Sequence, residues 1–262
     1  MKAPDFTSPK KMLRWTQDEI SEIDDLFQGW GDGPFIQPGV RLTSDGAALE
    51  VYIASVADLP DRIERLVNIA ASSIRHAFDQ STYAVVMAVH DDWNGDQPYF
   101  PWRQSPADLE RWMDKFELPE PFRSVLRDMR PYNSVDGVQE GDDLLRDFAK
   151  AVNPAKHEAI FKLNGHLIPQ NFNLHFEGGG QTGIRAEFTT GMFPITAGKT
   201  FATVSGNIGI VEGVDAAFGC QLSFAGTPHL ESQPVLTVLG HAHSQLQRLL
   251  SSLEAAAGQI TD

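Results

Sequence analysis

The sequence predicts an α+β fold, in which helices come first, an antiparallel β-sheet follows and one further helix closes the chain. Residues 1–160 carry 17 basic and 28 acidic side chains, whereas residues 161–262 carry only 4 and 7. Gly, Thr and β-branched residues, which are typical of strands and turns, are frequent in that second part. We expect a single domain, because 262 residues can bury one core. Its expected sub-parts are an N-terminal helix (1–33), a hairpin (34–57), a helical part (58–161), a β-rich part (162–232) and a terminal helix (233–258).

The first sub-parts are predicted to be two helices with a hairpin between them. Thr16 and Glu19 have the T-x-x-E spacing of a capping box, so a helix is expected to begin there and to end at the glycines of 29–33. Asp-Gly within residues 44–46 separates two β-type runs and predicts the hairpin. The longest helix is expected over 61–90, because its apolar residues recur at helical spacing.

Shorter elements follow in the rest of the chain. Proline and capping signals predict helices over residues 105–116, 121–129 and 142–152. Asn153 followed by Pro154 predicts that another helix begins immediately afterwards. Glycine-rich turns separate expected strands at residues 172–176, 184–190, 201–211 and 218–224. Leucines at helical spacing predict the last helix over residues 234–257.

Composition excludes several classes of function. The net charge of −14 argues against broad nucleic-acid binding, because phosphates are bound by clustered Lys and Arg. No apolar run approaches the roughly 20 residues of a membrane span. The start of the chain lacks the apolar stretch of a signal peptide, and Cys220 is the single cysteine, so a cytoplasmic location is expected. No metal site or cofactor is expected, because no His, Cys or carboxylate pattern has the spacing of a ligand set.

The first candidate site is a polar stripe on the predicted 61–90 helix. Its members recur at steps of three and four residues, namely Asn68, Ser72, Arg75, Asp79 and Thr82. Arg75 and Asp79 are four residues apart and can pair. One interpretation is a solvated face with a surface ion pair, which is the ordinary state of such stripes. The other is a buried polar seam that faces another helix or a ligand.

The second candidate site is the start of the helix predicted at Asn153. Lys156 and His157 would lie in its first turn, where free backbone N–H groups and the helix dipole favour an anion. The alternative is that Lys156 pairs with a carboxylate elsewhere and His157 packs in the core. Candidate ligand-binding residues are therefore Arg75, Asn153, Lys156 and His157, and candidate catalytic residues are Arg75, Asp79 and His157.

Four short segments carry a resemblance to known proteins: 74–83, 100–102, 129–132 and 153–157. Over residues 34–257 they resemble a widespread group of bacterial proteins of uncharacterised activity, which have a helix of the type L-R-x-x-L-D-H, an F-P segment, a Q-P-Y turn and an N-x-D-K-H-R element. The first helix also resembles, more weakly, the R-x-x-x-x-H motif of HEPN domains, many of which are metal-independent ribonucleases. Gln80 replaces the histidine of that motif, and Glu158 replaces the arginine of K-H-R. Glutamine cannot transfer a proton near neutral pH, so Arg75 and Gln80 are a poor catalytic pair unless His76 or His157 substitutes for the histidine.

Three hypotheses on function follow. The first is a non-catalytic cytoplasmic protein that binds a protein partner or a small anionic ligand and is itself a homo-oligomer. The second, implied by the resemblance, is a HEPN-like ribonuclease of a toxin or defence system that uses Arg75, Lys156 and His157. The third is a structural or assembly protein that pairs through its sheet. Enzymatic activity is left undecided, with the missing histidine against it.

Overall fold

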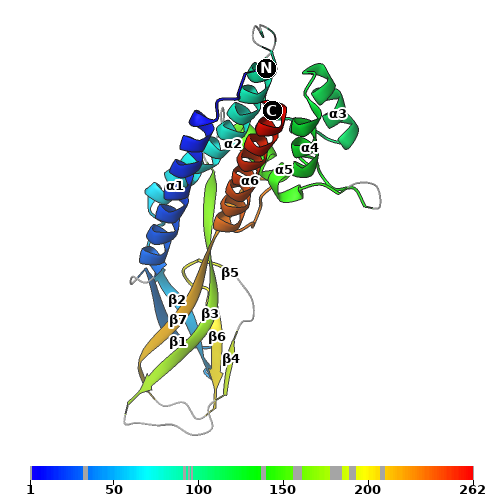
Figure 1. Cartoon of the computed structure of the whole chain (residues 1–262). Helices are drawn as coiled ribbons and strands as arrows, with labels where there is room; N and C mark the ends of the chain where they lie inside the picture. Colours follow the sequence, from blue (N-terminus) through cyan, green and yellow to red (C-terminus); the bar gives the residue numbers. More distant parts are fainter. Residues whose placement is uncertain are drawn as a thin grey trace. The chain divides into compact units, whose positions relative to one another are not determined.

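The computed structural model describes residues 2–31, 35–90, 93, 95, 97–136, 140–155, 161–177, 185–188, 193–206 and 210–261 (Figure 1). These residues form six helices and seven strands, which confirms the predicted α+β class. They group into two compact units. The helical unit comprises Met1–Asp24, Glu64–Lys162 and Phe224–Asp262, and the strand unit comprises Asp25–Ile63 and Leu163–Ser223. The single domain expected from the sequence stays a prediction.

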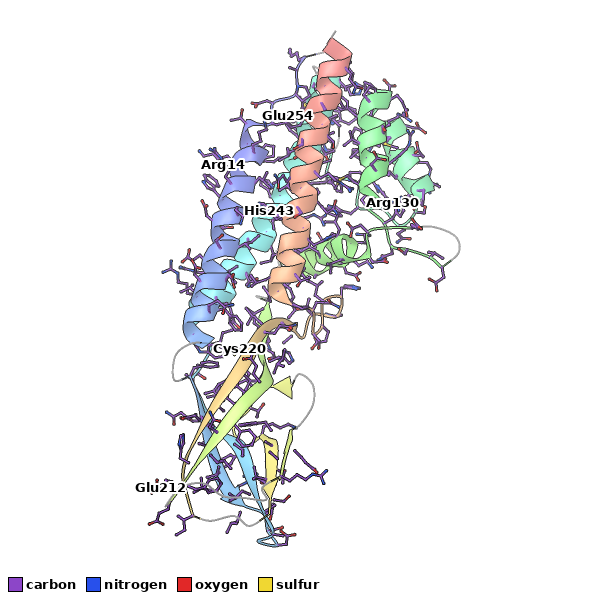
Figure 2. The ribbon with its side chains drawn as sticks, turned by 60° about the horizontal axis from the view of Figure 1, so that its bottom comes forward. Arg14, Arg130, Glu212, Cys220, His243 and Glu254 are labelled. Carbon is purple, nitrogen blue, oxygen red and sulfur yellow. The ribbon has the colours of Figure 1, made fainter. Side chains whose placement is uncertain are left out.

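The described residues form six helices (Figure 1): α1 (Thr7–Gly31), α2 (Asp61–Val89), α3 (Pro106–Lys115), α4 (Glu120–Met129), α5 (Asp143–Ala155) and α6 (Val235–Thr261). All lie in the helical unit except the end of α1 after Asp24 and the start of α2 up to Ile63, which belong to the strand unit. Leucines at helical spacing bury one side of α6, and Ile74 and Phe78 are among the fully buried residues of α2. Polar contacts also tie α6 to its neighbours. His243 Nε2 lies 3.0 Å from the carbonyl oxygen of Leu13 in α1, and Arg248 Nη2 donates to the carbonyl of Asp128 at 2.7 Å (Figure 2 labels His243).

Two helix boundaries differ from the predicted ones. Helix α1 begins at Thr7, where the backbone N–H donates to Asp5 Oδ1, and not at Thr16. Thr16 is buried inside the helix, and its hydroxyl donates back to the carbonyl of Leu13 at 2.9 Å, which satisfies it without a cap. Asn153 does not begin a new helix either, because α5 continues to Ala155. Pro154 has no backbone N–H to donate to the carbonyl four residues earlier, and α5 ends one residue after it.

The strand unit contains two antiparallel sheets (Figure 1). The first has the order β1-β2-β6-β4. Its strands are β1 (Ile36–Leu42), β2 (Ala48–Val56), β6 (Thr200–Ser205) and β4 (Arg185–Phe188). The second has the order β5-β3-β7, with β5 (Phe193–Pro194), β3 (Lys162–Phe176) and β7 (Val211–Ala225). The unit's own apolar cluster is built mainly from β2 and β6 and consists of Leu49, Val51, Ile53, Leu167, Phe201, Ala202 and Val204.

The hairpin predicted between β1 and β2 is confirmed, and Gly46 has the positive φ of 70° that such a turn requires. Residues 201–211 were expected to form one strand. They instead contain most of β6 and only the first residue of β7, because β6 ends at Ser205 and β7 begins at Val211. Strand β5 was not predicted, since two residues are too few to show an alternation. Cys220 is half-buried in β7 (Figure 2). Among the described helices, none is both long enough and apolar enough to cross a membrane.

Candidate functional site

The polar stripe of α2 is a buried seam. Asp79 and Thr82 are buried, and Asn68, Ser72 and Arg75 are half-buried. Three of these side chains bond to the backbone of other segments: Asn68 Oδ1 accepts from the N–H of Phe161, Arg75 Nη1 donates to the carbonyl of Ala149, and Asp79 Oδ1 accepts from the N–H of Phe100, each at 3.1 Å. The interpretation as a solvated face is therefore wrong, and the stripe fixes α2 to its surroundings.

Arg75 is the most constrained member of this seam. Its Nε lies 3.8 Å from Asp79 Oδ2, and the two side chains are only 12% and 7% exposed. Its Cζ lies 4.5 Å from the centroid of the Trp102 ring, which is a cation–π contact. Burial lowers the pKa of Arg75 to about 10, Asp79 opposes that shift, and the charge of Arg146 adds to it. Arg75 therefore stays charged near neutral pH, with another cation close by.

A cavity of about 590 Å³ lies next to this arginine, and we name it the basic pocket. It is lined by Trp102, Arg103, Gln104, Asp108, Arg111, Trp112, Lys115 and Arg146. Four of these side chains are cations and one is a carboxylate. The four residues from α3 are spaced so that they fall on one face of that helix. Asp108 is already engaged, because hydrogen bonds from Ser105 and Arg111 lower its pKa.

Three residues that line the basic pocket each have one buried donor atom that the described residues leave unmatched. The Nε atoms of Arg103 and Arg146 and the Nε1 atom of Trp102 are buried and have no hydrogen-bond partner there. Burial lowers the pKa of both Arg103 and Arg146, and the charge of Arg103 lowers that of Arg146 further. The charge of Asp108 opposes this shift at Arg103, and the charge of Asp147 opposes it at Arg146. Unmatched guanidinium donors around one cavity suit an anion with several acceptor oxygens.

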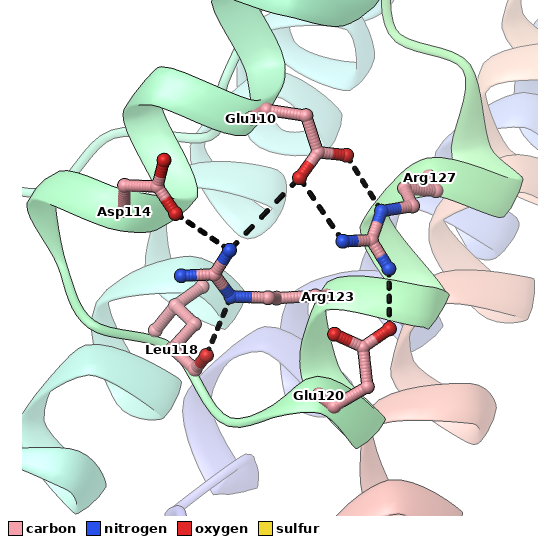
Figure 3. Close-up of polar contacts among 6 residues, drawn as sticks. All are labelled: Glu110, Asp114, Leu118, Glu120, Arg123 and Arg127. Carbon is pink, nitrogen blue, oxygen red and sulfur yellow. Dashed lines mark hydrogen bonds and ion pairs between the residues drawn. The ribbon is translucent and has the colours of Figure 1, made fainter.

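Ion pairs between α3 and α4 hold the helix that carries half of this pocket (Figure 3). Arg127 binds both carboxylate oxygens of Glu110, with its Nε 2.6 Å from one and its Nη2 3.0 Å from the other. Arg123 Nη1 lies 2.6 Å from Asp114 Oδ1, and Arg123 Nε donates to the carbonyl of Leu118 at 2.7 Å. The network thus links the side chains of α3 and α4 with each other and with the turn between the two helices.

The structure brings together some of the predicted site residues and not others. Arg75 and Asp79 pair as expected, whereas Asn153 is exposed in the last turn of α5. Lys156 and His157 lie outside the described residues, so the anion site predicted there stays a prediction. Sequence reasoning missed the basic pocket altogether. The signal for its α3 part was present, because Asp108, Arg111, Trp112 and Lys115 follow helical spacing; the parts from Arg103 and Arg146 had no such signal.

Three of the segments that carry the resemblance meet around Arg75. The N–H of Phe100 bonds to Asp79, Trp102 packs on Arg75, and the N–H of Arg103 donates to the carbonyl of Pro131 at 3.1 Å. Among the described residues, no three His, Cys, Asp or Glu side chains are grouped as a metal ion would require. No protein-family model, curated protein or solved structure matches the chain, and the resemblance therefore stays a prediction.

Proposed function

We propose that this protein binds a small anionic ligand in the basic pocket, through the guanidinium groups of Arg103 and Arg146. The observation that carries the proposal is the pair of half-buried arginines whose buried Nε atoms have no partner among the described residues. The chain as a whole has a net charge of −14, yet this cavity is lined by four cations and one carboxylate. The cavity is therefore locally positive in a chain whose net charge is negative.

The electrostatics give a reason why a ligand would bind. A buried donor that lacks a partner costs about 1–3 kcal/mol, and more when it is charged. Arg103 and Arg146 also repel each other, which is one cause of the lowered pKa of Arg146. An anion beside both guanidinium groups would supply opposite charge, so its binding reduces this repulsion. A phosphate, sulfate or carboxylate group has the planar or tetrahedral oxygens that guanidinium groups bind.

The size of the cavity sets the class of ligand. Its volume of about 590 Å³ falls inside the usual range for small-molecule sites, roughly 300–1,000 Å³. Trp102 and Trp112 also line it, so the ligand can have an organic part beside the anionic group. In this proposal Arg75 is a positioning residue: its Nη1 is bonded to Ala149, and its guanidinium supports the ring of Trp102 from behind the pocket wall.

Isothermal titration calorimetry with inorganic phosphate tests the proposal. We expect saturable binding by the wild type and a loss of affinity of about tenfold to a hundredfold in Arg103→Gln and in Arg146→Gln, because each removes charged hydrogen bonds. Arg14→Gln is the matched control, since Arg14 is an exposed arginine of α1 and its loss changes the net charge equally. A wild type that leaves phosphate unbound, or an equal loss in the Arg14 variant, would contradict the proposal.

The other hypotheses stay predictions and are open to test on the same protein. Cleavage of RNA by the wild type, with a loss of cleavage in Arg75→Ala, would support the ribonuclease. Light scattering would reveal a homo-oligomer, as the assembly hypothesis requires. Phosphate binding without RNA cleavage is the result that the anion-binding proposal expects.

A further inference from the structure

A second cavity, which we name the apolar pocket, has a volume of about 520 Å³ and shares no lining residue with the basic pocket. One wall is the segment that precedes α1 together with its first turn, from Lys2 to Pro9. The other wall is the second half of α2, from His76 to Ala88, with Gln97 and Tyr99 beside it. All of these elements belong to the helical unit.

The side chains of the apolar pocket are mainly uncharged and include two aromatic rings. Tyr83 and Tyr99 are 42% and 55% exposed, although both are large side chains. Ala84 and Met87 contribute apolar surface between them. Small-molecule sites typically combine such a lining with a few polar groups, and tyrosine rings pack well on other flat rings.

The charges at this pocket nearly cancel. Its described charged residues are Lys2, Asp5 and Asp79, and Asp79 is paired with Arg75 and bonded to the N–H of Phe100. Lys2 and the exposed Asp5 have opposite charges, so the lining of the cavity offers a charged ligand little net attraction. This is the opposite of the basic pocket, where cations outnumber carboxylates.

Polar groups in the wall can orient a ligand. His76 Nε2 and Gln80 Nε2 lie 2.9 Å apart, and the Tyr99 hydroxyl donates to Gln97 Oε1 at 3.2 Å. These two pairs place side chains that can donate hydrogen bonds and side chains that can accept them at the edge of the cavity. An aromatic molecule with a polar edge matches this combination of rings and hydrogen-bonding groups.

We propose that the apolar pocket is a second ligand site, which takes an uncharged aromatic small molecule. The proposal does not depend on anion binding, because it rests on a different cavity with a different lining. It also assigns a role to the exposed tyrosines and to the His76–Gln80 pair, which the basic pocket does not use.

The test is a titration with N-phenyl-1-naphthylamine, an uncharged aromatic amine whose fluorescence rises in an apolar site. We expect saturable binding by the wild type and a loss of affinity of about tenfold or more in Ala84→Phe, since the added ring occupies the cavity. Ala255→Phe is the control, because Ala255 is an exposed residue of α6 and receives the same ring. Phosphate binding should be unchanged in both variants, which separates this proposal from the previous one.

Tyr99→Ala is the second variant, because Tyr99 is more than half exposed and its removal leaves the core intact. Tyr99→Ala should weaken binding of the probe. It replaces Ala84→Phe as the test if circular dichroism shows that Ala84→Phe does not fold. No saturable binding by the wild type would overturn the proposal. So would binding at wild-type affinity in Tyr99→Ala and in a folded Ala84→Phe.

Discussion

One ion pair, between Arg75 and Asp79, connects the basic pocket with the apolar pocket, and we propose a different class of ligand for each pocket. Asp79 lines the apolar pocket, and its partner Arg75 packs on Trp102, which lines the basic pocket. In the apolar pocket the charged side chains nearly neutralise one another, so shape and apolar contact select the ligand. In the basic pocket the buried guanidinium donors have no described partner, so charge selects it.

The largest expected effect comes from breaking the ion pair between the two pockets. Arg75→Met should lower the free energy of unfolding by about 3 kcal/mol, because it leaves the buried carboxylate of Asp79 without its cation. It should also weaken binding of both phosphate and N-phenyl-1-naphthylamine, since Trp102 and Asp79 each lose a neighbour. Urea denaturation followed by circular dichroism measures the first effect, and the two titrations measure the second.

The double variant Arg75→Met/Asp79→Leu isolates the pair from its surroundings. It should be less destabilised than the sum of the two single variants, because no uncompensated charge stays buried. If Arg75→Met lowered the free energy of unfolding by less than about 1 kcal/mol, the pair would be no stronger than an ordinary surface ion pair. That result would contradict the inference that the pair connects the two pockets.

An intermediate effect separates the two pockets through ligand-dependent stability. Phosphate at a hundred times its dissociation constant should raise the free energy of unfolding by about 2.7 kcal/mol. At the same phosphate concentration the gain should persist in Ala84→Phe and fall to about 0.4–1.4 kcal/mol in Arg146→Gln, because only the second change alters the basic pocket. Thermal unfolding with and without phosphate measures it. A gain that persists in full in Arg146→Gln would mean that phosphate binds somewhere else.

The helices and the hairpin were predictable because their signals are local. Helix α2 and the β1–β2 hairpin follow from apolar spacing and from an Asp-Gly turn, which tertiary contacts do not change. The capping pattern at Thr16 predicted the wrong start for α1, because a threonine hydroxyl can also donate to a carbonyl of its own helix, as Thr16 does. Local patterns thus place elements well and place their ends less well.

The candidate sites were predictable only in part, for a different reason. The stripe on α2 identified Arg75 and Asp79, but periodicity could not say whether it faces water or protein. The basic pocket takes Arg103 from a connecting segment and Arg146 from α5, which lie 43 positions apart in the sequence. Which side chains meet across such a distance depends on how the helices pack, and no single pattern in the chain records that.

The smallest expected effect concerns the network of Figure 3, and it asks whether ion pairs or packing keep the basic pocket in shape. Arg127→Gln should cost about 1 kcal/mol of unfolding free energy or less, because Arg127 and its partners Glu110 and Glu120 are all well exposed. The hydrogen bond from Arg127 is the main cause that lowers the pKa of Glu110. A lowered carboxyl pKa gives stability that is complete above the pKa of a free glutamate, about 4.3, and that is lost as the pH falls further.

The difference in unfolding free energy between the wild type and Arg127→Gln should therefore shrink between about pH 5 and pH 3. Phosphate affinity at neutral pH should stay within about twofold of the wild type, because exposed ion pairs contribute little energy. Trp112, Met113 and Leu126 are buried and hold α3 and α4 in place through apolar packing. A tenfold loss of phosphate affinity in Arg127→Gln would contradict this expectation. It would mean that the ion pairs, and not the packed core, keep Arg111 and Lys115 in position.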